Sequence, residues 1–244
     1  MSLAILRQKG LIGPARAPPV HAAAFPFGLG EQGLHEVADH AHGDRAAATG
    51  FVLAAARRVP SGALLWIAQD SFAHDAGRLS EAGLIPFPGR SSLRLNLITR
   101  RAAAVLWAVE EAVASGAVSH VMAELETADF TATRRLTLAS SRHGVPVTLL
   151  LPYTREGATA AATRWRIRAQ PSAANPYDAA APGHARWRAV LERARTAPDM
   201  TGKDFDLEWN DETLSLNLVS GLAAGQAAAK PAGGPAAPRR LRAG

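Results

Sequence analysis

The sequence predicts an α/β protein with a mostly parallel, helix-covered sheet and antiparallel strands towards the C-terminus. First, apolar runs such as residues 64–68 and 145–151 lie between turn signals, as is typical of strands buried on both faces. Second, helical patterns separate these runs at the spacing of βαβ units. Third, residues 164–168 alternate arginine with Trp165 and Ile167, which indicates a strand with one polar face.

The first half begins with a short predicted strand at residues 34–37. An Ala-rich helix is expected over residues 46–58, because Ala is the strongest helix former, and Pro60 ends it. The buried strand at residues 64–68 follows and leads to Asp70.

The next helix is predicted over residues 101–115, with an apolar stripe that includes Val105 and Val109, and it ends at Gly116. Residues 118–123 then form a second buried strand ending on Glu124. Asp129 or Thr131 can cap the following helix, which is expected to reach His143 and stop at Gly144. The strand at residues 145–151 ends at Pro152.

The C-terminal part changes character, with further strands expected at residues 186–195, 205–209 and 214–219 and a hairpin turn at 210–212. Three regions are therefore predicted. Residues 1–24 are an N-terminal arm or linker, residues 25–219 are the core, and residues 220–244 are a basic, disordered Ala/Gly/Pro tail.

Composition narrows the function classes. The 244 residues contain no cysteine, which excludes disulfides, thiolate metal sites and a cysteine nucleophile. The net charge is +6 and comes almost wholly from arginine, with eleven arginines against three acidic residues between positions 134 and 195. Such a region suits phosphates or an acidic protein surface. With neither a signal-peptide pattern nor an apolar run long enough to span a membrane, we expect a cytoplasmic protein without membrane partners.

The order of segments over residues 25–169 resembles the ATPase core of RecA-type recombinases, which predicts a RecA-like fold. More specific are Trp-Ala-Val-Glu-Glu-Ala at 107–112, Thr-Arg-Trp-Arg at 163–166 and Leu-Glu-Trp at 207–209. On these segments the chain resembles the ImuA family, RecA-like accessory proteins of bacterial inducible mutagenesis. The resemblance implies SOS-induced, error-prone translesion DNA synthesis at the nucleoid. The partners it implies are an ImuB-like polymerase-related protein, an error-prone DNA polymerase subunit and RecA.

A phosphate-binding loop requires Gly-x-x-x-x-Gly-Lys-Ser/Thr, because glycine amides wrap the phosphates and the lysine neutralises their charge. At the matching place, residues 38–50 read ADHAHGDRAAATG, with no lysine and with two aspartates that would repel phosphates. Nucleotide hydrolysis is therefore not expected, and neither is a catalytic residue, cofactor or metal. Arg45 can contact an anion but cannot rebuild the loop alone.

Two acids match vestigial ATPase positions in this resemblance. Asp70 matches the catalytic glutamate and Glu124 the magnesium-binding aspartate. We expect them to cap strand ends at the wet rim of the sheet, and the alternative is a residual magnesium site. His40 and His42 suggest zinc, but a structural zinc site normally has four ligands, so solvated side chains are the simpler interpretation.

Arginines are the predicted partner-binding residues: Arg164, Arg166, Arg168, Arg186, Arg188, Arg239, Arg240 and Arg242. They can bind an acidic surface or add salt-sensitive DNA affinity, and the alternative is a sheet edge guarded by charge. The segments that match the recombinase DNA loops, residues 125–130 and 153–162, are acidic or carry a single arginine, so DNA binding should be weak or indirect. The five tryptophans are expected in the core, and any exposed one would be an interface anchor.

Three functions follow. The first is a non-catalytic accessory protein that docks the error-prone polymerase machinery and modulates RecA. The second is a cell-division inhibitor of the SulA type, which shares the fold and the damage response. The third is an ATP-dependent recombinase-like motor, against which the sequence at residues 38–50 argues.

Overall fold

The computed structural model describes residues 25–55, 63–80, 94–210 and 212–219. The helices are α2 (Arg45–Ala55), α3 (Asp70–Asp75), α5 (Ala102–Ser115), α6 (Phe130–His143) and the 3-10 turn η3 (Pro198–Met200). The strands are β1 (Leu34–Asp39), β2 (Ala63–Gln69), β3 (Arg94–Thr99), β4 (Val118–Glu124), β5 (Val147–Leu151), β6 (Thr163–Gln170), β7 (Arg186–Ala194), β8 (Asp204–Asn210) and β9 (Ser215–Leu218).

The nine strands of the described residues form one sheet in the order β3-β2-β4-β5-β1-β6-β7-β8-β9. The strands from β3 to β6 in this order pair in parallel, whereas β7, β8 and β9 continue the sheet in antiparallel pairs. The predicted fold class is therefore confirmed. β1 lies at the centre of the sheet between β5 and β6, and all six of its residues are buried.

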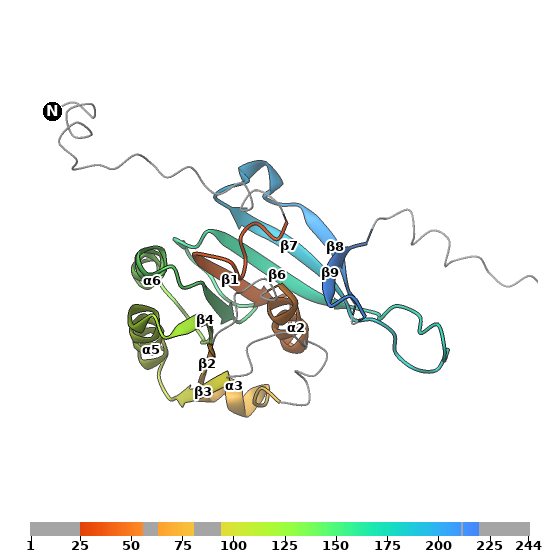
Figure 1. Cartoon of the computed structure of the whole chain (residues 1–244), viewed down its shortest axis with the longest axis horizontal. Helices are drawn as coiled ribbons and strands as arrows, with labels where there is room; N and C mark the ends of the chain where they lie inside the picture. Colours follow the sequence, from red (N-terminus) through yellow and green to blue (C-terminus); the bar gives the residue numbers. More distant parts are fainter. Residues whose placement is uncertain (1–24, 56–62, 81–93, 211, 220–244) are drawn as a thin grey trace, which may run out of the picture.

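Helices cover the two faces of the parallel half. Figure 1 shows α5 and α6 beside one another on one face and α2 on the other. Under α5 and α6 the core contains Val105, Val109 and Leu136, and under α2 it contains Phe51 and Trp165. Among the described helices, none is both long enough and apolar enough to cross a membrane.

Local signals place the helix ends as expected. Asp129 Oδ1 accepts a hydrogen bond from the amide of Ala132 at 2.7 Å and so caps α6. Gly116 and Gly144 end α5 and α6 with φ of 63° and 71°, a conformation that glycine adopts without strain.

The structure also corrects the prediction. β3 and α3 were not predicted, and Asp70 is not the last residue of a strand but the first residue of α3. The strand predicted at 145–151 begins at Val147. The arm at 1–24, the tail at 220–244, residues 56–58 of the predicted helix and Asp211 of the predicted turn lie outside the described residues.

Candidate functional site

A cavity of about 1120 Å³ opens at the carboxyl ends of the parallel strands. Asp39 ends β1, Glu124 ends β4, and Arg45 begins α2, so three charged side chains from different elements line one space. Further lining comes from Trp66, Phe72, Glu126, Tyr153, Trp187 and Trp209. In open parallel sheets, ligand sites form in crevices at this edge.

Arg45 is the only cation among these three groups, and it forms an ion pair with Asp39. Arg45 Nη2 lies 3.1 Å from Asp39 Oδ1, and the guanidinium carbon lies 4.6 Å from the centre of the Phe72 ring. The Asp39 and Arg45 side chains are only 6% and 14% exposed, so the ion pair is largely removed from water. Its geometry is imperfect, since Asp39 Oδ1 and Arg45 Nη1 have no hydrogen-bond partner among the described residues.

Burial also changes how the two carboxyl groups titrate. It raises the pKa of Asp39, although Arg45 acts in the opposite direction. It raises the pKa of Glu124 as well, opposed by Arg45 and by a hydrogen bond with Trp66. Two desolvated carboxyl groups thus lie near the guanidinium of Arg45, and the other arginines that line the cavity, Arg78 and Arg186, come from outside the start of α2. The arrangement is electrostatically unlike a phosphate-binding loop.

Of the two acids predicted at vestigial ATPase positions, only Glu124 lines the cavity. Glu124 lines the cavity and is buried, whereas the Asp70 side chain is 40% exposed on α3 and lies 3.9 Å from His74. Among the described residues no group of three or more His, Asp or Glu side chains is arranged to hold a metal ion. His42 is among the residues that line the cavity, and His40 is exposed.

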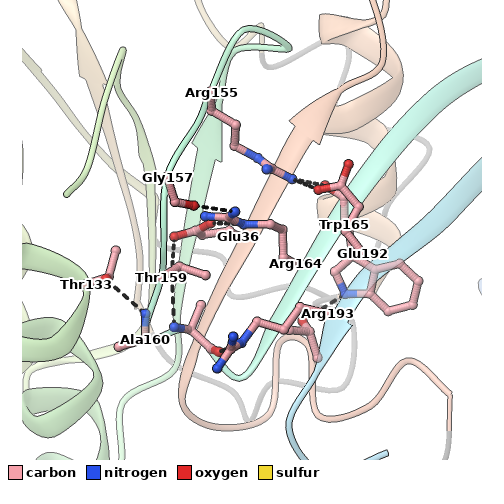
Figure 2. Close-up of polar contacts among 12 residues, drawn as sticks. Glu36, Thr133, Arg155, Gly157, Thr159, Ala160, Arg164, Trp165, Glu192 and Arg193 are labelled. Atoms are coloured by element: carbon pink, nitrogen blue, oxygen red, sulfur yellow. Dashed lines mark hydrogen bonds and ion pairs between the residues drawn. The ribbon is translucent and has the colours of Figure 1, made fainter. Parts of the chain in front are cut away.

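The segment at residues 153–162, which was predicted to correspond to the second recombinase DNA loop, is fixed to the sheet by largely buried ion pairs (Figure 2). Arg155 donates to Glu192 and to the carbonyl of Trp165, and its side chain is only 4% exposed. The single arginine of this segment therefore faces inwards, because hydrogen bonding to Glu192 holds it there. Arg166 also donates to Glu192.

A second group holds the same segment near its other end. Glu36 of β1 is fully buried and accepts from Arg164 Nε at 2.7 Å and from Thr159 Oγ1 (Figure 2). Arg164 also donates to the carbonyl of Gly157 at 2.9 Å. With both groups in place, the segment is packed against β1 and β6.

Four of the five arginines predicted on the sheet pair with acidic residues that are distant in the sequence, and Arg168 is the exception. Arg186 pairs with Glu208, and Arg188 with Asp204 at 2.8 Å. Arg168 is exposed, lies opposite Arg188 in the β6–β7 register, and has no partner among the described residues. The alternative of a guarded sheet edge is wrong for β6, which lies between β1 and β7.

Four of the five tryptophans are 0–5% exposed, as predicted for core residues. Trp107 is the exception, with 63% of its surface exposed on α5. The sequence carried a signal for this, because Trp107 lies midway between Val105 and Val109 and so points away from their buried stripe.

Fold and site together define a mostly parallel, helix-covered α/β protein in which an arginine–aspartate pair stands where a phosphate-binding loop would lie. No family model matches the chain. Two curated relatives, Protein ImuA from the NA1000/CB15N and the ATCC 19089 strains of Caulobacter vibrioides, are each 33% identical over 187 residues, which is 70% of this chain and 74% of theirs. The chain belongs to the ImuA family. The crystal structure of the RadB recombinase is similar with a TM-score of 0.49 and 12% identity, covering 77% of this chain and 91% of that one.

Proposed function

We propose that this chain is a non-catalytic accessory protein of SOS-induced, error-prone translesion DNA synthesis. In this proposal it docks the ImuB-like protein and the error-prone polymerase subunit, and it modulates RecA. Membership of the ImuA family supports a role in DNA damage-induced mutagenesis. The Arg45–Asp39 ion pair in the cavity supports the absence of ATP hydrolysis.

The ion pair between Arg45 and Asp39 is the observation that carries the proposal. Arg45 is the one cation near the start of α2, and its charge is balanced by a carboxylate of the same chain. Binding of a nucleotide would require that this pair separate and that phosphates approach Glu124. Both steps cost free energy, because the groups are desolvated and no lysine of the chain lies near this place in the sequence.

DNA is a weak candidate for a direct ligand. The inward-facing Arg155 removes positive charge from the segment that would contact it. The partner-binding proposal for the sheet arginines is carried best by Arg168, whose charge is not balanced by an acid in the described part of the chain. Arg239, Arg240 and Arg242 lie outside the described residues and remain part of the proposal on sequence alone.

The test uses the purified full chain in two assays. We expect no phosphate release from ATP above background with or without single-stranded DNA, and retention of the ImuB-like protein, the polymerase subunit or RecA in pull-downs. Arg168→Glu should weaken retention, whereas Arg100→Glu, at an exposed arginine that does not line the cavity, is the matched control. DNA-stimulated turnover, or failure to retain any of the three proteins, would refute the proposal. Filamentation on overexpression would favour the cell-division alternative.

A further inference from the structure

Helices α5 and α6 expose three large apolar side chains, of which Phe130 at the start of α6 is 46% exposed. Trp107 on α5 and Leu138 on α6 are each 63% exposed, in contrast to the other four tryptophans. Tryptophan is highly buried on average, and with tyrosine and arginine it is enriched among interface hot spots.

Trp107 and Leu138 belong to one surface. Arg135 Nη2 of α6 lies 2.5 Å from Glu110 Oε2 of α5 and so bridges the two helices, which pack beside one another (Figure 1). Trp107 lies one turn before Glu110, and Leu138 and Arg142 lie one and two turns after Arg135. We call these five residues and the neighbouring Arg134 the α5–α6 ridge.

Charge indicates what the ridge can bind. α6 contains no acidic residue, and its Arg134 and Arg142 are exposed and have no partner in the described part of the chain. Glu110 balances Arg135, and Glu111 of α5 faces solvent on the other flank of Trp107. The α6 side is therefore positive beside an apolar strip. A second copy would bring its own arginines to that side, so an acidic partner fits better.

We propose that the α5–α6 ridge docks an acidic amphipathic segment of a partner protein. An apolar side chain of that segment packs on Trp107 and Leu138, and its carboxylates pair with Arg134 and Arg142. The proposal deepens the proposed function, on which it rests, by assigning the docking surface. Nucleic acid is a poorer occupant, because phosphates would approach Glu110 and Glu111.

The experiment measures binding of the full chain to the purified ImuB-like protein, the polymerase subunit and RecA separately, by biolayer interferometry. Trp107→Ala should weaken binding to one of them by about tenfold or more, the range of a hot-spot tryptophan. Arg142→Glu should also weaken it, and wild-type binding should fall with added salt. Tyr177→Ala is the matched control, because Tyr177 is 90% exposed but lies between β6 and β7, and it should bind like wild type.

Other outcomes overturn the proposal and separate its parts. If wild type binds a partner and Trp107→Ala binds it equally well, the α5–α6 ridge is not the docking surface, and the proposed function still stands. No binding of any of the three proteins to wild type would overturn both. A wild-type dimer that Trp107→Ala dissociates in analytical ultracentrifugation would make the occupant a second copy. Urea unfolding of Trp107→Ala should match wild type within about 0.5 kcal/mol, since the side chain is exposed.

Discussion

Acid should destabilise this protein through His35, a buried imidazole in β1. Its Nε2 lies 2.8 Å from the carbonyl of Gln32, which can only accept, so Nε2 carries the proton. Nδ1 then accepts from Thr163 Oγ1 at 2.7 Å, and Thr163 in turn accepts from Trp165 Nε1 at 2.9 Å. Both nitrogens of the neutral ring therefore have hydrogen-bond partners. Burial lowers the pKa of His35 from 6.5 to about 4, although hydrogen bonds to the backbone of Gln32 and Gly28 oppose this.

The sign and size of the effect follow from that difference. Because the folded pKa lies below the unfolded one, the stability is fully present above pH 6.5 and is lost as the pH falls towards 4. The complete loss is about 3 kcal/mol, at 1.36 kcal/mol per pH unit, and about 2 kcal/mol of it occurs between pH 7 and pH 5.

Urea unfolding at pH 7 and pH 5 measures this loss. His35→Gln is the comparison, because its amide can still donate to Gln32 and accept from Thr163 but does not titrate. Wild type should lose about 2 kcal/mol more than His35→Gln between the two pH values. Equal losses within about 0.5 kcal/mol would show that the folded protein accepts a proton at His35, and the reasoning would fail.

Two carboxyl groups give the remaining predictions. Glu36→Gln should lower the free energy of unfolding by about 3 kcal/mol. This is near the low end for a broken buried ion pair, because the Arg164 side chain is 16% exposed. A loss no larger than that of Arg168→Ala in the same urea titration would contradict the prediction. Glu124→Gln should raise the urea midpoint at pH 7, because burial raises the pKa of Glu124 and the charged form is disfavoured. That gain should shrink as the pH falls through the raised pKa towards 4.5, and a lower midpoint at pH 7 would argue against it.

The sequence predicts the parallel half well, because its signals are local. Apolar runs identify β2, β4 and β5, and the Asp129 cap and Gly144 delimit α6 within one residue. β3 and α3 were missed because both are only six residues long, and the β3 sequence Arg-Leu-Asn-Leu-Ile-Thr has no buried face for a pattern to reveal.

The candidate site was less accessible to sequence reasoning, because its contacts are non-local. Arg164 and Glu36 are 128 residues apart, so a run of arginines gave no sign that β1 would supply an acid. The apposition of Asp39, Arg45 and Glu124 likewise depends on which strand ends the topology brings together. Trp107 was placed in the core from its residue type alone. Its position on the helix relative to Val105 and Val109 shows that it points outwards.

The central position of β1 has a consequence for synthesis of the chain. β1 is the first of the described strands to emerge, yet its two neighbours are β5 and β6, and His35 pairs with Thr163 across 128 residues of sequence. Six residues that are wholly buried in the finished sheet therefore stay unpaired until more than half of the protein has been made. Pairings this distant slow folding and leave apolar strands exposed to aggregation. We therefore expect β1 to need protection from aggregation during translation.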